Sequence, residues 1–102
     1  MAEKTRLVWS KSAQIERKEI FSYWNKRNGS TAYSNKLNIL IKDTLQAIID
    51  HPYSGQSTNI DAVRYYVARD YLLLYEIAEK QILILCMWDG RQDPEKLKKR
   101  LE

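Results

Sequence analysis

The chain has few of the residues from which metal, redox and nucleotide sites are usually built. Its 102 residues include one cysteine, one histidine, two prolines and three glycines. One cysteine and one histidine are too few for a Cys/His zinc site, and no internal disulfide can form. Three widely spaced glycines exclude a phosphate-binding loop and a dinucleotide-binding fingerprint. We therefore expect neither a metal nor a cofactor.

Long apolar runs are also missing. The longest, Ile82–Trp88, is far shorter than the roughly 20 residues that a membrane-spanning helix needs. The N-terminal residues contain no apolar stretch typical of a signal peptide. The lone Cys86 has apolar neighbours and suits a reducing compartment. These features predict a soluble cytoplasmic protein with no membrane partner.

The composition that is present indicates one small globular domain over residues 1–102. The chain holds seven tyrosines and three tryptophans, most of which should serve the core. The formal net charge is +4. A moderately basic surface suits an anionic partner such as a nucleic acid or an acidic protein, and a merely solvated basic surface is the alternative.

The first half of the chain predicts a strand and two helices. Arg6–Trp9 is a short apolar run typical of a strand, and Ser10 or Ser12 can cap the helix that follows. Asn28-Gly29 ends this helix, because glycine readily takes the left-handed cap conformation. Apolar residues on its buried face, with Arg17 among them, are Ala13, Ile20, Phe21 and Trp24.

The second helix begins at Ser30 or Thr31 and ends at His51-Pro52, where proline disfavours the helical conformation. So short a joint predicts an antiparallel helical hairpin. The apolar stripe of the second helix comprises Tyr33, Leu37, Leu40, Ile41 and Ile48, widened by Leu45 and Ile49.

Beyond a turn-rich loop over Tyr53–Asp61, the spacing of the apolar residues changes. It goes from the helical period of about 3.6 residues to the strand period of two. Three strands are expected, joined by a tight turn at Arg69-Asp70 and another at residues 78–80. Turns this short require an antiparallel meander. The last strand is almost wholly apolar, as in a central strand covered on both faces. The three strands are residues 63–68, 71–77 and 81–88.

A short C-terminal helix is expected to start at Asp93-Pro94-Glu95. About eight residues cannot hold a helix alone, so Leu97 and Leu101 should dock it on the sheet. The predicted fold is α+β, in the order strand, helix, helix, three strands, helix. The helical hairpin packs on a mainly antiparallel sheet.

Cationic and aromatic residues of the second half form the candidate binding site. Arginine can bind phosphates bidentately, and tyrosine can stack on an exposed base. Arg64 and Tyr66 share one face of their strand, Arg69 lies at the turn, and the segment after the last strand carries a further cation. We predict that they converge at one rim of the sheet. The candidate target-binding residues are Arg64, Tyr66, Arg69, Asp89, Arg91 and Gln92.

Each of these residues also has a purely structural interpretation. Arg64 can be a charge that protects a strand edge from pairing. Asp89 and Arg91 can form an ion pair that shapes the loop, and Trp88 can belong to the core. His51 is interpreted as a residue at the end of a helix.

The strand half of the sequence resembles the RelE/ParE superfamily of toxins. The resemblance runs from Val63-Arg64 through Tyr71–Ile77 and Ile82–Leu85 to Trp88–Pro94, and it extends over about residues 5–101. No single motif in it is as specific as a metal signature, but the ordered set spans the chain. Matching positions upstream are Ile20, Tyr23-Trp24, Ala32-Tyr33, Pro52 and Gly55.

The resemblance implies a growth-arresting toxin neutralised by a cognate antitoxin. RelE-like members cut messenger RNA in the ribosomal A site, whereas ParE-like members inhibit DNA gyrase and lack the nuclease residues. RelE-like nucleases usually carry an arginine where this chain has Leu72, and a C-terminal tyrosine where it has Leu97. Their basic residue after the third strand survives as Arg91. The absence of the arginine at Leu72 and of the tyrosine at Leu97 favours the ParE-like, non-nucleolytic interpretation.

Two alternatives stay open at this point. If the chain is an endoribonuclease, the weak catalytic candidates that stabilise phosphorane charge are Arg64, Arg69 and Arg91. His51 or Asp89 would then be the candidate acid or base. The chain can also be a degenerate module without toxicity. The expected partners are an antitoxin, whose amphipathic acidic segment would lie in a groove, and either DNA gyrase or the ribosome with its message. Assembly into an oligomer through the antitoxin is possible.

Overall fold

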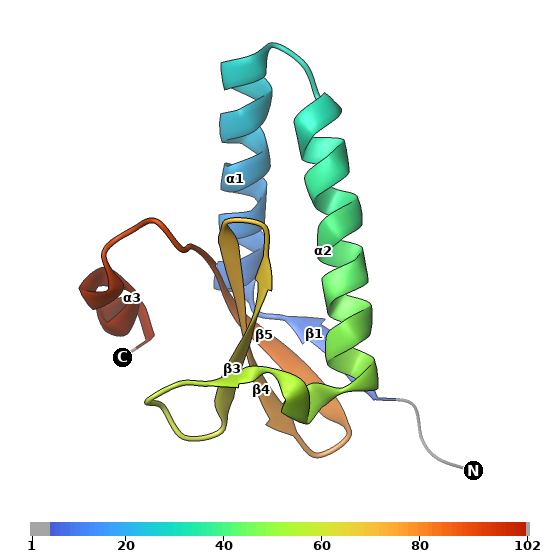
Figure 1. Ribbon diagram of the computed structural model, residues 1–102, viewed down its shortest axis with the longest axis vertical. Helices are drawn as coiled ribbons and strands as arrows, with labels where there is room; N and C mark the ends of the chain where they lie inside the picture. Colours follow the sequence, from blue (N-terminus) through green and yellow to red (C-terminus); the bar gives the residue numbers. More distant parts are fainter. Residues whose placement is uncertain (1–4, 102) are drawn as a thin grey trace.

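The structure, a computed structural model, describes residues 5–101 and has the α+β organisation that the sequence predicts (Figure 1). The order of the long elements is confirmed, with two helices after the first strand and one after the last. The elements are β1 (Arg6–Trp9), α1 (Lys11–Asn28), α2 (Ala32–Asp50), a 3-10 turn η1 (Pro52–Ser54), β2 (Gln56–Ser57), β3 (Val63–Ala68), β4 (Tyr71–Ala78), β5 (Gln81–Asp89) and α3 (Pro94–Leu101).

The sheet has five strands in the order β1-β5-β4-β3-β2. The antiparallel meander of β3, β4 and β5 is confirmed, and β1 lies parallel to β5, which makes β5 a central strand. The stretch predicted as a loop over Tyr53–Asp61 is only partly loop, because it contains part of η1 and the strand β2. Two residues are too few to show an alternating pattern, so the sequence could not indicate this strand.

The helical hairpin is held by caps at its ends and by one serine between its helices. Ser10, and not Ser12, is the N-cap of α1, because its Oγ accepts a hydrogen bond from the backbone N of Ala13 at 3.0 Å. Gly29 ends α1 with a left-handed φ of 63°. Ser34 donates its hydroxyl to the carbonyl of Phe21 and to the side chain of Asn25, so α2 is tied to α1 near the connection.

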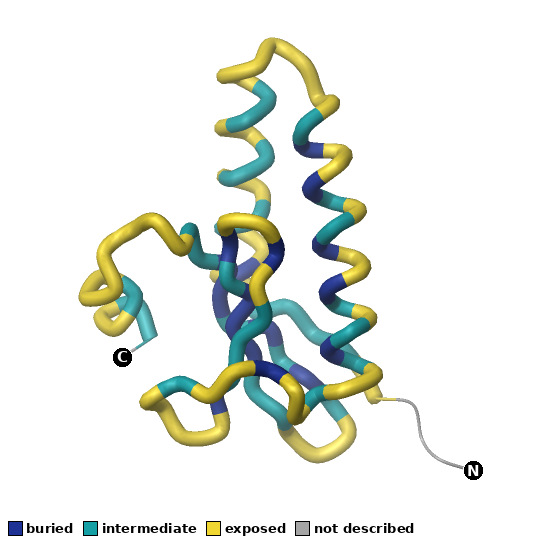
Figure 2. The backbone as a smooth tube through the Cα atoms, viewed as in Figure 1, coloured by how far each residue is buried: buried dark blue, intermediate teal, exposed yellow. Residues whose placement is uncertain are grey.

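Each face of the sheet is covered by different helices. The buried residues lie mainly along the strands and on one side of α2 (Figure 2). On the hairpin face, Leu73 and Met87 pack with Leu37 of α2. On the opposite face, the buried residues Val63, Leu74 and Cys86 form a cluster. The predicted docking residues of α3, Leu97 and Leu101, pack against this second cluster, as expected.

A bulge at Leu85 changes the direction of the side chains along β5. Leu74 of β4 pairs with Cys86, but the next residue, Tyr75, pairs with Ile84, so Leu85 is left without a partner in β4. Before the bulge, Ile84 belongs to the cluster on the hairpin face, whereas beyond it Cys86 belongs to the cluster under α3. One extra residue reverses the alternation in this way because successive side chains of a strand point to opposite faces.

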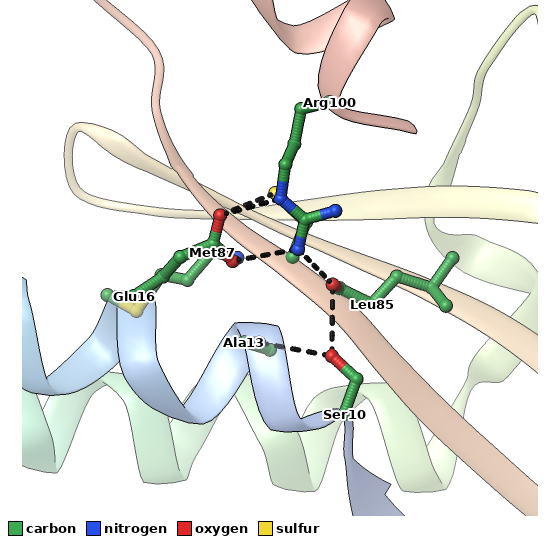
Figure 3. A network of polar contacts seen from close by, with 7 residues as sticks. Ser10, Ala13, Glu16, Leu85, Met87 and Arg100 are labelled. Carbon is green, nitrogen blue, oxygen red and sulfur yellow. Dashed lines mark hydrogen bonds and ion pairs between the residues drawn. The ribbon is translucent and has the colours of Figure 1, made fainter. Parts of the chain in front are cut away.

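The carbonyl oxygen of Leu85 anchors a polar network that joins α1, β5 and α3 (Figure 3). It accepts hydrogen bonds from Ser10 Oγ and from Arg100 Nη2, both at 3.2 Å. Arg100 Nε is 3.1 Å from Glu16 Oε2, and the other carboxylate oxygen of Glu16 accepts the backbone N–H of Met87 at 3.3 Å. The C-terminal helix is therefore fixed by a half-buried ion pair as well as by its two leucines.

Cys86 lies beneath this network and is fully buried. Burial raises the pKa of its thiol to about 12, and the negative charge of Glu16, whose Oε2 is 3.7 Å from Sγ, acts in the same direction. The thiol is therefore protonated and inert at neutral pH while α3 stays docked.

We expect Arg100→Ala to expose this thiol. The substitution removes charge-assisted hydrogen bonds worth about 1.5–3 kcal/mol, so α3 should open more often and the labelling of Cys86 by dithionitrobenzoate should accelerate roughly tenfold or more. Lys99→Ala removes the charge of an exposed neighbour in the same helix and should leave the labelling rate unchanged. A wild-type rate in Arg100→Ala would show that the ion pair with Glu16 does not hold α3.

Candidate target-binding site

The turn between β3 and β4 lies against the segment that follows β5. The backbone N of Gly90 donates to the carbonyl of Asp70 at 2.7 Å, and a Cβ at position 90 would lie only 3.1 Å from that oxygen. Arg69 takes the left-handed conformation with φ 62°, which forms the predicted tight turn. We call Arg69, Asp70 and residues 89–92 the sheet rim. The structure thus brings Arg69 and Arg91 to the same end of the sheet.

Asp89 and Arg91 form a bidentate ion pair within the rim. Arg91 Nε and Nη2 lie 3.0 and 2.9 Å from the two carboxylate oxygens of Asp89, and the backbone N of Arg91 also donates to Oδ1. The hydrogen bonds from Arg91 lower the pKa of the Asp89 carboxyl. The ion pair between Asp89 and Arg91, predicted as the purely structural interpretation of these two residues, is therefore present. It compensates much of the charge of Arg91, whose side chain is still 58% exposed.

Arg69 is linked to the helical hairpin through a cation–π contact and a tilted pair of aromatic rings. Its guanidinium carbon is 5.6 Å from the ring centroid of Tyr33, and the Tyr33 ring is 4.5 Å from that of Trp24. Trp24 Nε1 donates to the hydroxyl of Tyr71 at 2.8 Å. Trp24 and Tyr33 belong to the predicted apolar stripes, and nothing in their spacing distinguishes a core ring from one that supports an exposed arginine.

A groove of about 490 Å³ lies between α1 and the sheet rim. Apolar side chains from Ile20 and Met87 contribute to its lining, and Arg91 and Gln92 belong to it from the rim. On its α1 side, Glu16, Glu19 and Tyr23 lie off the predicted apolar stripe, whereas Ile20 belongs to it. None of the four was predicted as part of a binding site. The complete lining is Glu16, Glu19, Ile20, Tyr23, Tyr71, Met87, Trp88, Asp89, Arg91 and Gln92.

Arg64 does not belong to the sheet rim, and the predicted convergence of three arginines is wrong for this residue. It lies at the opposite end of β3 from Arg69, where Nη1 donates to the carbonyls of Tyr53 at 3.2 Å and Gly55 at 2.9 Å. It does not protect an open strand edge either, because β2 pairs with β3 at this residue through Ser57. The loop after α2 folds back over the strand and uses the guanidinium internally.

Tyr66 likewise lies away from the rim. Its hydroxyl donates to the carbonyl of His51 at 3.1 Å, and its ring contacts that of Tyr75. Arg64 and Tyr66 lie on the same face of β3, opposite Tyr65, as predicted. That face packs against the end of α2 and the loop that follows α2. His51 ends α2 there, as interpreted from the sequence, and so supplies no acid or base beside Arg91.

Two general properties bear on the site. Within residues 5–101, no group of three or more His, Cys, Asp and Glu side chains is arranged to hold a metal ion. None of the helices in this part of the chain is long and apolar enough to cross a membrane.

The family model described as the ParE toxin of the type II toxin–antitoxin system parDE matches residues 7–94. This chain belongs to the ParE toxin family. The matched residues include the whole sheet rim and all but the last helix of this ParE-family toxin. Its fold is similar to a solved structure titled as the chromosomal ParDE TA system from P. aeruginosa. The TM-score is 0.75 at 15% identity, over 86% of this chain and 98% of the other. No curated protein matches the chain.

In this ParE-family toxin, we expect Arg64→Ala to lower stability more than Arg69→Ala does. Arg64 makes two hydrogen bonds to loop carbonyls, of which the one to Gly55 is partly buried. Their loss should reduce the free energy of unfolding by about 1–3 kcal/mol, measured by urea denaturation at unchanged m-value. Arg69 provides the control, because it is exposed and its substitution removes only the contact with the Tyr33 ring. Equal stabilities of the two variants would contradict the structural role of Arg64.

The ion pair at the rim predicts an unusually acidic Asp89. Its carboxyl pKa, followed by NMR, should lie below the ordinary value of about 3.9 and should return toward that value in Arg91→Ala. Because the folded-state pKa is lowered, the pair stabilises the fold above the ordinary carboxyl pKa. This contribution is lost as the pH falls through the folded-state pKa. An unshifted Asp89 in the wild type would show that the pair does not persist in solution.

Proposed function

We propose that this ParE-family toxin arrests growth by binding and inhibiting DNA gyrase, and that a cognate antitoxin neutralises it. The observation that carries the proposal is the composition of the sheet rim. Arg69 and Arg91 present cationic side chains there, with Gln92 exposed next to them. Arg91 is already paired with the carboxylate of Asp89. Such a rim suits contact with a macromolecular surface better than bond cleavage.

Cleavage of RNA needs an acid and a base beside the group that stabilises the phosphorane. Asp89 is held by Arg91 with a lowered carboxyl pKa, so it is poorly suited to deliver a proton at neutral pH. The two positions where RelE-like nucleases carry catalytic side chains are Leu72 and Leu97. Both leucines pack in the apolar cluster beneath α3. These features favour the non-nucleolytic function.

The groove between α1 and the sheet rim is the proposed antitoxin site. Ile20 and Met87 give it apolar lining, and the half-exposed Tyr23 belongs to it as well. An amphipathic helix could lay its apolar side in such a groove. The expected acidic character of the antitoxin segment finds little support in this lining. Three carboxylates belong to it, from Glu16, Glu19 and Asp89, against the one cation of Arg91.

The gyrase proposal predicts that the purified toxin inhibits the supercoiling of relaxed plasmid. Because Arg69 and Arg91 are the cations of the rim, the double variant Arg69→Ala/Arg91→Ala should need roughly tenfold more protein for the same inhibition, as when contacts worth about 1.4 kcal/mol are lost. A matched variant, Lys96→Ala/Lys99→Ala, removes two exposed charges outside the rim and should inhibit like the wild type.

Supercoiling that is unaffected at saturating toxin would exclude gyrase as the target. If induced cells then show new cuts in translated messages that vanish in Arg91→Ala, the ribosome-dependent nuclease replaces the proposal. Growth that continues normally on induction without any antitoxin would instead indicate a module that has lost its toxicity. Neutralisation is tested separately, by co-expression of the protein encoded in the neighbouring reading frame.

A further inference from the structure

The positive charge of the chain is concentrated in the outer part of the helical hairpin. Between Ile20 and Lys42 the sequence has four cationic residues and no acidic one. Of the 17 lysines and arginines, 13 therefore lie elsewhere, and they are equalled by the 13 aspartates and glutamates. The net charge of +4 thus comes wholly from this stretch, which we call the basic hairpin stretch. Its cations are Lys26, Arg27, Lys36 and Lys42.

These cations are not used to hold the fold together. All four are exposed, and within residues 5–101 none of them takes part in an ion pair. The ion pairs of Arg91 with Asp89 and of Arg100 with Glu16 lie on the sheet and on α3. A partner can therefore meet the four charges without first breaking an ion pair.

The stretch includes a projecting, polar tip. The outer ends of α1 and α2 stand clear of the sheet along the longest axis of the molecule (Figure 1). Lys26 and Arg27 lie in the last turn of α1, and Lys36 lies near the start of α2. Between residues 25 and 38 every exposed residue is charged, polar or small. The exposed Tyr23 and Ile39 lie just outside this range, so residues 25–38 themselves expose no fully solvent-facing large apolar side chain of the kind that anchors a protein–protein interface.

We propose that the basic hairpin stretch binds the phosphate backbone of a nucleic-acid duplex. A duplex carries one negative charge per roughly 1.7 Å of its axis, and it is bound mainly through cations and polar donors that contact phosphates. A convex tip with lysines on both helices can lie against such a backbone. Arg27 is held at the outer end of α1, where its guanidinium lies 5.9 Å from the ring centroid of Trp24 and Nη1 lies 3.5 Å from the Tyr23 hydroxyl. The proposal does not depend on gyrase being the target.

Fluorescence anisotropy of labelled duplexes over a salt series tests the proposal. A DNA duplex and an RNA duplex of the same sequence form the two arms, and they identify which backbone is preferred. Three phosphate contacts predict a slope of about −2.7 in log K against log salt. This slope corresponds to a loss of roughly 40-fold in affinity between about 50 and 200 mM salt.

Two triple variants with equal net charge separate the tip from the bulk charge of the chain. Lys26→Gln/Arg27→Gln/Lys36→Gln should bind at least tenfold more weakly at about 100 mM salt and lose most of the slope. Lys96→Gln/Lys98→Gln/Lys99→Gln removes three exposed cations from α3 and should keep the wild-type slope. Circular dichroism checks that both variants stay folded, as their exposure leads us to expect.

Three results would overturn the proposal. The first is the absence of salt-dependent binding of the wild type to either duplex. The second is an equal loss of binding in the two triple variants, which would assign the effect to overall charge. The third is binding of polyglutamate as tight as that of the duplexes, with the same dependence on Lys26, Arg27 and Lys36. That result would make the partner an acidic protein.

Discussion

The one-residue bulge at Leu85 determines which side chains reach the sheet rim. Without it, the alternation of β5 would point Trp88 toward the hairpin and Asp89 toward α3. With it, Met87 lies on the hairpin face, and Trp88 packs in the cluster under α3. The bulge also leaves a carbonyl free of the β4 ladder, and Arg100 binds that carbonyl. The orientation of the rim and the attachment of the last helix thus depend on the same irregularity in the sheet.

The elements that the sequence predicts well are those with strong local signals. The bounds of α1 follow from a capping serine and a left-handed glycine. The end of α2 follows from the proline after His51, whereas Thr31 precedes the helix without a capping hydrogen bond from its side chain. The tight turn at Arg69-Asp70 separates two strands of clear alternation or strong apolarity. The docking of Leu97 and Leu101 also follows from local chemistry, because a helix of eight residues needs apolar contacts to persist.

The candidate site was harder to predict because it depends on register and on long-range contacts. β5 is nearly all apolar, so no polar residue marks where its alternation reverses at Leu85. Arg64 looks like an exposed strand cation, and only the return of the loop over β3 supplies the carbonyls of Tyr53 and Gly55 that it binds. The stacking of Arg69 on Tyr33 joins residues far apart in the chain. None of these contacts leaves a pattern in the local sequence.

The position of β5 has a consequence for how the protein folds. β5 follows the other four strands along the described part of the chain, yet it lies inside the sheet, between β1 and β4. Ser10 contacts a carbonyl 75 residues downstream, and Glu16 pairs with a residue 84 positions away. Closing loops of this length is slow compared with forming the helical hairpin. The sheet rim and the docked α3 therefore form late in folding, only after β5 has joined β1 and β4.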